Sequence, residues 1–361
     1  MTKKIFLGGK GITKRISIGG DSPVTLQTMW KEPINDLKNS PQKLERIISK
    51  ITELQILGCD IIRFAVPDVE SAEGLCEIAR NTSMPLVADI HFDYKLALEC
   101  LKGNVSAIRI NPGNIGSKEN TKIVVDACKD NGVAIRIGIN SGSLPQDLQQ
   151  QIASKQISRA QGLCETAVRE AEVFEELNFD QYVVSMKSSD VNETIECNRF
   201  YAKKYSNPLH LGVTEAGPLI GGIVKSSIAF STLLNENIGD TIRVSLSSSV
   251  ENEVIAGLNI LKECGKREGG VKIVSCPRCG RIGFDVHDFN NRWETKLLSM
   301  KKNITVAVMG CVVNGPGEGK HADIGIAGTG SKVIIFKKGK IVQTVNKEFA
   351  DKVFEEELNS L

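Results

Sequence analysis

The sequence of 361 residues has no uninterrupted run of about 18 apolar residues, so it predicts no membrane-spanning helix. Its first residues include basic side chains but reach Gly8 and Gly9 without the apolar segment that a secretion signal needs. The formal net charge is only +2, and no large block of Lys and Arg suggests a nucleic-acid surface. These absences predict a cytoplasmic protein that binds neither nucleic acid nor a membrane.

Between about residues 24 and 246, short apolar runs alternate with helical patterns, and we count eight such runs. Near-continuous apolar runs of this kind are typical of parallel strands covered on both faces. In residues 41–54, apolar side chains recur every three or four positions after Ser40 and Pro41, which provide an N-cap and a first-turn proline. Eight units predict an α/β fold, a (β/α)8 TIM-type barrel. A doubly wound sheet is the alternative, although no Gly-x-Gly-x-x-Gly motif opens the first helix.

The pattern changes after a polar, glycine-rich segment at residues 262–270, where we place a domain boundary. We therefore expect a barrel over residues 1–265 and a second domain over residues 266–361. The second domain shows five strand-like runs and two helical stretches, which predict a small α+β module.

Cationic and polar side chains occur in or just after the predicted barrel strands, where a barrel gathers its functional groups. A single Arg in such a place could pair with a carboxylate inside the barrel, but five cations with few matching acids indicate a cleft for a phosphorylated ligand, such as a diphosphate. The cations are Arg63, Arg109, Arg136, Lys187 and Arg243, and polar neighbours include His91, Asn140, Glu215 and Ser245.

Ten Cys residues are present, and without a secretion signal they are expected to be reduced thiols. Seven are scattered singly, mostly among apolar helical residues, as expected for small buried side chains. The other three lie beside Gly or Pro. Cys276 and Cys279 form a Cys-x-x-Cys pair, and Cys311 follows about thirty residues later. Three thiolates on tight turns predict a metal site.

Cysteine spacing leaves the fourth position of this metal site open. A [4Fe–4S] cluster accepts three Cys and can leave one iron to a different ligand or to a substrate, and Glu318 is the candidate here. A Cys3His zinc site using His287 or His321 is the alternative, and it would give a phospholigand-binding barrel with a structural zinc tail. A pure electron-carrier role for the tail would leave the five cations unexplained.

Longer motifs accompany the cysteines and extend the pattern over nearly the whole chain. They occupy residues 63–67, 89–93, 109–114, 185–189, 210–217 and 238–246, together with the cysteine motifs at residues 276–281 and 310–318. The set closely resembles 4-hydroxy-3-methylbut-2-enyl diphosphate synthase, an iron–sulfur enzyme family of the methylerythritol phosphate route to isoprenoids.

The resemblance implies reductive dehydroxylation and ring opening of 2-C-methyl-D-erythritol 2,4-cyclodiphosphate to 4-hydroxy-3-methylbut-2-enyl diphosphate. Two electrons would pass singly from reduced flavodoxin or ferredoxin through a [4Fe–4S] cluster. The resemblance also implies a homodimer whose active site is shared between the barrel of one subunit and the cluster domain of the other.

Individual roles follow from the same resemblance. The cluster ligands would be Cys276, Cys279, Cys311 and Glu318, and the catalytic residues Glu215, Glu318 and His91. The substrate would meet Arg63, Arg109, Arg136, Asn140, Lys187, Arg243 and Ser245. Three places depart from the family pattern, namely residues 30–33, residues 217–222 and Arg278.

Overall fold

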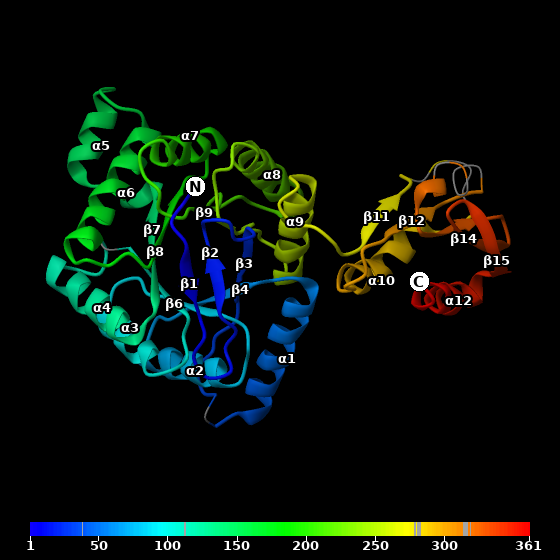
Figure 1. The fold of residues 1–361 in the computed structure, drawn as a ribbon, viewed down its shortest axis with the longest axis horizontal. Coiled ribbons are helices and arrows are strands. Elements are labelled where there is room, and N and C mark those ends of the chain that lie inside the picture. The colour runs from blue at the N-terminus through cyan, green and yellow to red at the C-terminus, as the bar shows by residue number, and fades with distance from the viewer. Residues whose placement is uncertain (38, 112, 278, 280–282, 313–316, 318) are drawn as a thin grey trace. The chain divides into compact units, whose positions relative to one another are not determined.

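The computed structural model describes residues 1–361 apart from positions 38, 112, 278, 280–282, 313–316 and 318. The chain divides into two compact units, Met1–Arg267 and Glu268–Leu361 (Figure 1). Within the described part, no helix is long and apolar enough to cross a membrane.

The first unit is built around eight parallel strands whose order in the sheet is β8-β7-β6-β5-β4-β3-β10-β9. A parallel bridge between Val184 and Leu209 joins the chain of β8 to the residue before β9, so the sheet closes on itself. The predicted TIM-type barrel is therefore confirmed. The strands are β3 (Thr25–Met29), β4 (Ile61–Ala65), β5 (Leu86–Asp89), β6 (Ala107–Ile110), β7 (Ala134–Asn140), β8 (Tyr182–Lys187), β9 (His210–Leu211) and β10 (Thr241–Ile242).

Helices cover the outside of this barrel (Figure 1). The first shows why the sequence forms them, since Pro41 opens it, Ile47, Ile51 and Leu54 are buried, and Gly58 ends it with a left-handed φ of 111°. The helices are α1 (Pro41–Leu57), α2 (Val69–Arg80), α3 (Tyr94–Leu101), α4 (Lys118–Asn131), α5 (Gln146–Ala153), α6 (Arg159–Glu176), α7 (Val191–Ala202), α8 (Leu219–Asn235) and α9 (Val250–Glu263), with a short 3-10 turn, η1 (Ser141–Ser143), before α5.

A hairpin that the sequence analysis did not anticipate precedes the barrel. Strands β1 (Ile5–Leu7) and β2 (Ile16–Ile18) pair antiparallel. Their buried side chains pack against residues near the amino ends of the barrel strands, such as Ile61 and Val87. This packing fills one end of the barrel with apolar side chains, so the carboxyl ends of the strands are left for a polar site.

The second unit is a five-stranded mixed sheet in the order β11-β12-β13-β14-β15. The first three strands run parallel and the last two antiparallel to their neighbours. Phe289 and Trp293 stack within its core, and Phe354 meets both rings edge-on. The elements are β11 (Lys272–Ser275), α10 (Val286–Leu298), β12 (Thr305–Met309), η2 (Gly319–His321), β13 (Ile324–Gly328), β14 (Lys332–Lys337), β15 (Lys340–Asn346), η3 (Lys347–Phe349) and α12 (Ala350–Asn359).

Candidate functional site

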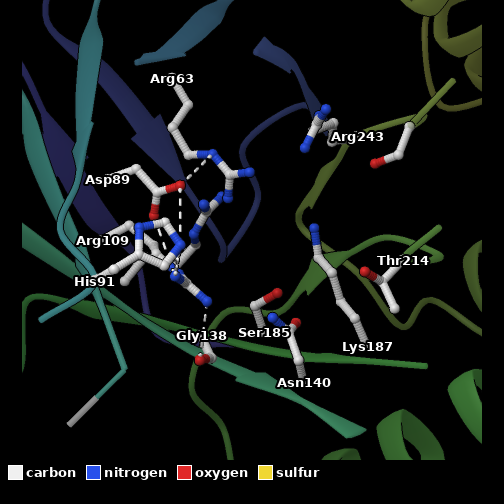
Figure 2. Close-up of a pocket in the computed structure, with 12 residues that line it drawn as sticks. Arg63, Asp89, His91, Arg109, Gly138, Asn140, Ser185, Lys187, Thr214 and Arg243 are labelled. Atoms are coloured by element: carbon white, nitrogen blue, oxygen red, sulfur yellow. Dashed lines mark hydrogen bonds and ion pairs between the residues drawn. The ribbon is translucent and has the colours of Figure 1, made fainter. Parts of the chain in front are cut away.

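Adjacent barrel strands bring charged side chains to the same level because their registers align. Asp89 on β5 stands opposite Arg109 on β6, and Arg109 stands opposite Arg136 on β7. Side chains from all around the barrel converge on one pocket of about 90 Å³ (Figure 2). Its lining consists of Arg63, Asp89, His91, Arg109, Arg136, Gly138, Asn140, Ser185, Lys187, Thr214, Arg243 and Ser245.

The carboxylate of Asp89 organises one wall of this pocket. Arg109 Nη1 donates to Asp89 Oδ1 at 3.2 Å, and Arg63 Nε lies 3.5 Å from Oδ2. Burial alone would raise the pKa of Asp89, but the two guanidinium groups outweigh it and lower that pKa to about 2. Arg109 also donates to the Gly138 carbonyl at 3.2 Å, which fixes its direction. Asp89 therefore stays ionised and holds two cations at the pocket.

Among the remaining cations, Arg243 has one carboxylate nearby, that of Glu253 at 3.6 Å. Lys187 and Arg243 lie across the pocket from Arg63 and Asp89 (Figure 2). Arg136 Nη1 donates to the Gln27 side chain at 2.7 Å, but among the described residues its Nε and that of Arg243 have no hydrogen-bond partner. Burial, followed by the four neighbouring guanidinium groups, places the pKa of Lys187 well below its usual value. Buried donors without acceptors and crowded positive charge indicate a multiply charged anionic ligand.

The pocket contains every predicted substrate-binding residue and His91, whose Nε2 lies 3.5 Å from Arg109 Nη1. Glu215 is placed differently. It is exposed and does not line the pocket, although Thr214 just before it does. Its left-handed backbone (φ 50°) is unusual for a residue with a side chain and marks a tight bend at the pocket edge.

Sequence reasoning missed two partners of the cations. Gln27 on β3 accepts from Arg136, but nothing in the sequence indicated this role, because a single uncharged polar side chain is common inside a strand. Glu253, on the first turn of α9, lies 3.6 Å from Arg243 and is 1% exposed. An acidic residue in the first turn of a helix normally lies exposed and interacts favourably with the helix dipole. The sequence therefore did not distinguish Glu253 from such an exposed residue.

In the second unit, two of the predicted metal ligands follow neighbouring parallel strands. Cys276 comes directly after β11, and Cys311 follows β12 by two residues. Because Ser275 pairs with Val308, both cysteines reach the same edge of the sheet. The Gly310 N–H donates to Cys276 Sγ at 3.1 Å. Backbone N–H donors of this kind favour a thiolate or the sulfur of a bound metal centre.

Cys279 is exposed, and the predicted fourth ligand, Glu318, lies outside the described residues, as does Arg278. Among the residues that are described, no three His, Cys, Asp or Glu side chains form a metal-binding group. The exposure of Cys279 contrasts with the scattered cysteines, since burial raises the pKa of both Cys59 and Cys128 to about 12 and keeps them as thiols. The donor set near β11 and β12 therefore fits a thiolate-bound metal centre, and the buried cysteines do not.

Comparison with known proteins identifies both units. Residues 10–258 match the family model of the GcpE TIM-barrel domain, and residues 272–360 match that of the GcpE protein C-terminal domain. A protein of Treponema denticola named 4-hydroxy-3-methylbut-2-en-1-yl diphosphate synthase (flavodoxin) is 56% identical, over 100% of this chain and 99% of its own. Proteins of the same name from Treponema pallidum (52%, over 99% and 92%) and Clostridium acetobutylicum (47%, over 96% and 95%) are similar as well. The resemblance seen in the sequence motifs is confirmed, and this chain belongs to the GcpE family.

Proposed function

We propose that this chain converts 2-C-methyl-D-erythritol 2,4-cyclodiphosphate to 4-hydroxy-3-methylbut-2-enyl diphosphate by reductive ring opening and loss of a hydroxyl group as water. One observation carries the proposal most directly, namely that four Arg and one Lys line a single pocket at the carboxyl ends of the barrel strands. A cyclic diphosphate presents oxygens in several directions, which suits cations arriving from several strands. The names of the relatives at 47–56% identity support the same reaction.

The barrel would bind and orient the substrate. Arg109, held by Asp89 and Gly138, offers a fixed guanidinium, whereas Arg136 and Arg243 offer buried donors that still lack acceptors among the described residues. Each charge-assisted hydrogen bond to a phosphate oxygen would contribute about 1.5–3 kcal/mol. The remaining contacts in the proposal are Arg63, Lys187, Asn140 and Ser245.

Two side chains would handle protons. Glu215 is the proposed donor to the departing hydroxyl, supported by its exposed position directly after the pocket residue Thr214. His91 would lie near the substrate, since its side chain is 48% exposed at the pocket and its Nε2 is 4.0 Å from Asp89. Both residues remain accessible to water, which lets each be recharged with a proton between turnovers.

The second unit would hold a [4Fe–4S] cluster through Cys276, Cys279, Cys311 and Glu318. When bound, such a cluster supplies single electrons and an iron that can accept a substrate oxygen in place of the carboxylate. Cys276 and Cys311 are supported by their placement after neighbouring strands, and the Gly310 N–H would stabilise negative charge on Cys276 Sγ. Reduced flavodoxin is the proposed donor, in keeping with the relatives' names.

We further propose a cytoplasmic homodimer in which the barrel of one subunit is completed by the cluster unit of its partner. Helix α8 supports self-association, because Ile220, Val224 and Ile228 form an apolar stripe one turn apart and each is at least 51% exposed.

Metal analysis of anaerobically purified protein tests the proposed function most directly. We expect about four iron and four sulfide per chain, a brown colour that bleaches on reduction, and turnover with reduced flavodoxin. A colourless protein with one zinc and no turnover would instead indicate a phosphate-binding barrel with a structural zinc tail. In that case His287 and His321, both exposed, become the ligands to test.

A further inference from the structure

Glu253 is a buried carboxylate that lies behind the pocket and does not line it. Its side chain is 1% exposed, yet both of its oxygens are engaged. Oε2 accepts from Thr28 Oγ1 at 2.7 Å, and Oε1 accepts from the Leu246 N–H at 3.1 Å. It therefore connects β3 to the segment that follows β10, where Arg243 and Ser245 are located.

Lys31 reaches the same carboxylate from the segment after β3 that departs from the family pattern. Its ammonium lies 3.0 Å from Glu253 Oε1, and it also donates to the carbonyls of Leu246, at 2.9 Å, and Ser248. An ammonium has three donors, so these three contacts occupy all of them. The backbone beside Lys31 is anchored as well, because the Trp30 N–H donates to the Arg63 carbonyl at 2.8 Å.

Two cations compete for this single buried negative charge. Lys31 is closer to Oε1, at 3.0 Å, than Arg243 Nη2, at 3.6 Å. Arg243 Nε is buried without a hydrogen-bond partner in the described structure. Glu253 therefore orients the arginine but leaves at least one of its N–H donors without an acceptor. If Lys31 were absent, the uncompensated carboxylate would attract Arg243 into a closer pair and withdraw its donors from the pocket.

The segment held by this pair also contacts the neighbouring loop, which follows β9, the strand that pairs with β10. The Ser247 N–H donates to the Gly217 carbonyl at 3.0 Å, in the loop that carries Thr214 and Glu215. Displacement of residues 244–248 would therefore disturb Ser245 and that loop together.

We propose that Lys31 and Glu253 are positioning residues for the diphosphate site, with Lys31 neutralising Glu253 so that Arg243 remains available to the substrate. The proposal rests on the function assigned to the pocket above, and it adds two residues that do not touch substrate. It also gives a role to Lys31 within residues 30–33, where this chain departs from the family pattern.

Inorganic pyrophosphate provides a binding probe that does not depend on turnover. Calorimetric titration of the intact holo-protein should show roughly tenfold or greater weakening in Lys31→Met, the loss expected when one charge-assisted contact is withdrawn. Glu253→Gln should also weaken binding, because the Lys31 ammonium, left without its carboxylate, would repel Arg243 and displace it from its place in the pocket. The double variant Lys31→Met/Glu253→Gln removes both charges, so we expect its affinity to recover to within about threefold of the wild-type value.

Turnover should report the same pattern, with a raised KM and little change in kcat for Lys31→Met, because the lost interaction concerns substrate binding. Lys50→Met is the matched control. Lys50 contacts Glu251 on the same helix α9, outside the pocket, and its loss should leave pyrophosphate affinity and KM unchanged.

Wild-type affinity in Lys31→Met, or a double variant as weak as the single variants, would overturn the positioning role. If Lys31 has a purely structural role, Lys31→Met loses binding because the protein is destabilised, which a lowered melting temperature would reveal. In that case the double variant should bind pyrophosphate even more weakly than Lys31→Met, whereas the positioning role predicts that its affinity recovers. Failure of the wild-type protein to bind pyrophosphate would overturn both the positioning role and the proposed function.

Discussion

At the scale of single residues, the pocket concentrates positive charge that the fold itself does not need. Burial and the surrounding guanidinium groups lower the pKa of Lys187, so its ammonium is strained in the ligand-free protein. His210, fully buried nearby, has its pKa lowered by burial and then by Lys187 and the same arginines. A bound anion would offset the repulsion among these positive charges, so occupancy of the site is coupled to protonation of Lys187.

We therefore predict that anion binding draws a proton onto Lys187. The guanidinium groups keep their protons in proteins, so the lysine is the cation that can release one. A bound anion raises the pKa of Lys187 back toward its usual value, so proton uptake occurs at pH values between the lowered and the restored pKa, and affinity falls as pH rises through that window.

Calorimetry in buffers of different ionisation enthalpy measures this uptake. Sulfate is a suitable probe because its own charge is fixed near neutral pH. Lys187→Met should bind sulfate more weakly and without proton uptake. The same uptake in Lys187→Met would assign the proton to another titratable side chain near the pocket, namely His91, His210, Asp89, Glu215, Lys31 or Glu253.

At the scale of elements, the alternation of apolar runs and helical patterns was sufficient to predict all eight barrel strands. Their lengths were harder to predict, because β9 (His210–Leu211) and β10 (Thr241–Ile242) pair over only two residues. The hairpin β1–β2 escaped notice since its strands have three residues each, too few for periodicity to register. The cations could be predicted from their positions at strand ends, whereas Glu253 could not, since its role depends on a contact between α9 and β3.

Glycines within the barrel elements make room for the buried cations, and this gives an element-scale prediction. A Cβ at Gly138, within β7, would lie 2.3 Å from Arg109 Nε. Gly138→Ala should therefore displace the Arg109 side chain, at a cost of about 1–3 kcal/mol for overpacking. We expect roughly tenfold weaker pyrophosphate binding, measured by calorimetry.

Gly142→Ala is the matched control, because a Cβ there meets nothing within 4 Å and the residue lies in η1, shortly after β7. That variant should bind pyrophosphate as the wild-type protein does. Equal affinity in Gly138→Ala would mean that Arg109 does not contact the ligand, and the assignment of the pocket wall formed with Asp89 would have to be abandoned.

At the scale of the whole molecule, the two units supply complementary chemistry. The barrel has the cations but, among its described residues, only buried or half-buried cysteines. The second unit carries Cys276 and Cys311 just after its strands β11 and β12, and Cys279 three residues beyond Cys276. Under the proposed function the barrel would bind the diphosphate and the second unit would deliver the electrons, so the reaction would require the two units to meet, within one chain or between two.

Mixed dimers distinguish these possibilities. We expect Arg109→Ala to disable the barrel and Cys311→Ser to disable the proposed cluster unit, so each variant alone should lack turnover. If the site is shared between subunits, a mixed dimer contains one site with both defects and one site with neither. Random reassembly of equal amounts should then restore roughly a quarter of the wild-type activity, since half of the dimers are mixed and one of their two sites is intact. If each chain completes its own site, every site in the mixture carries a defect and the activity stays at the level of the separate variants. Sedimentation analysis of the mixture, with one variant tagged, would establish that mixed dimers had formed, so an inactive mixture would count against the shared site.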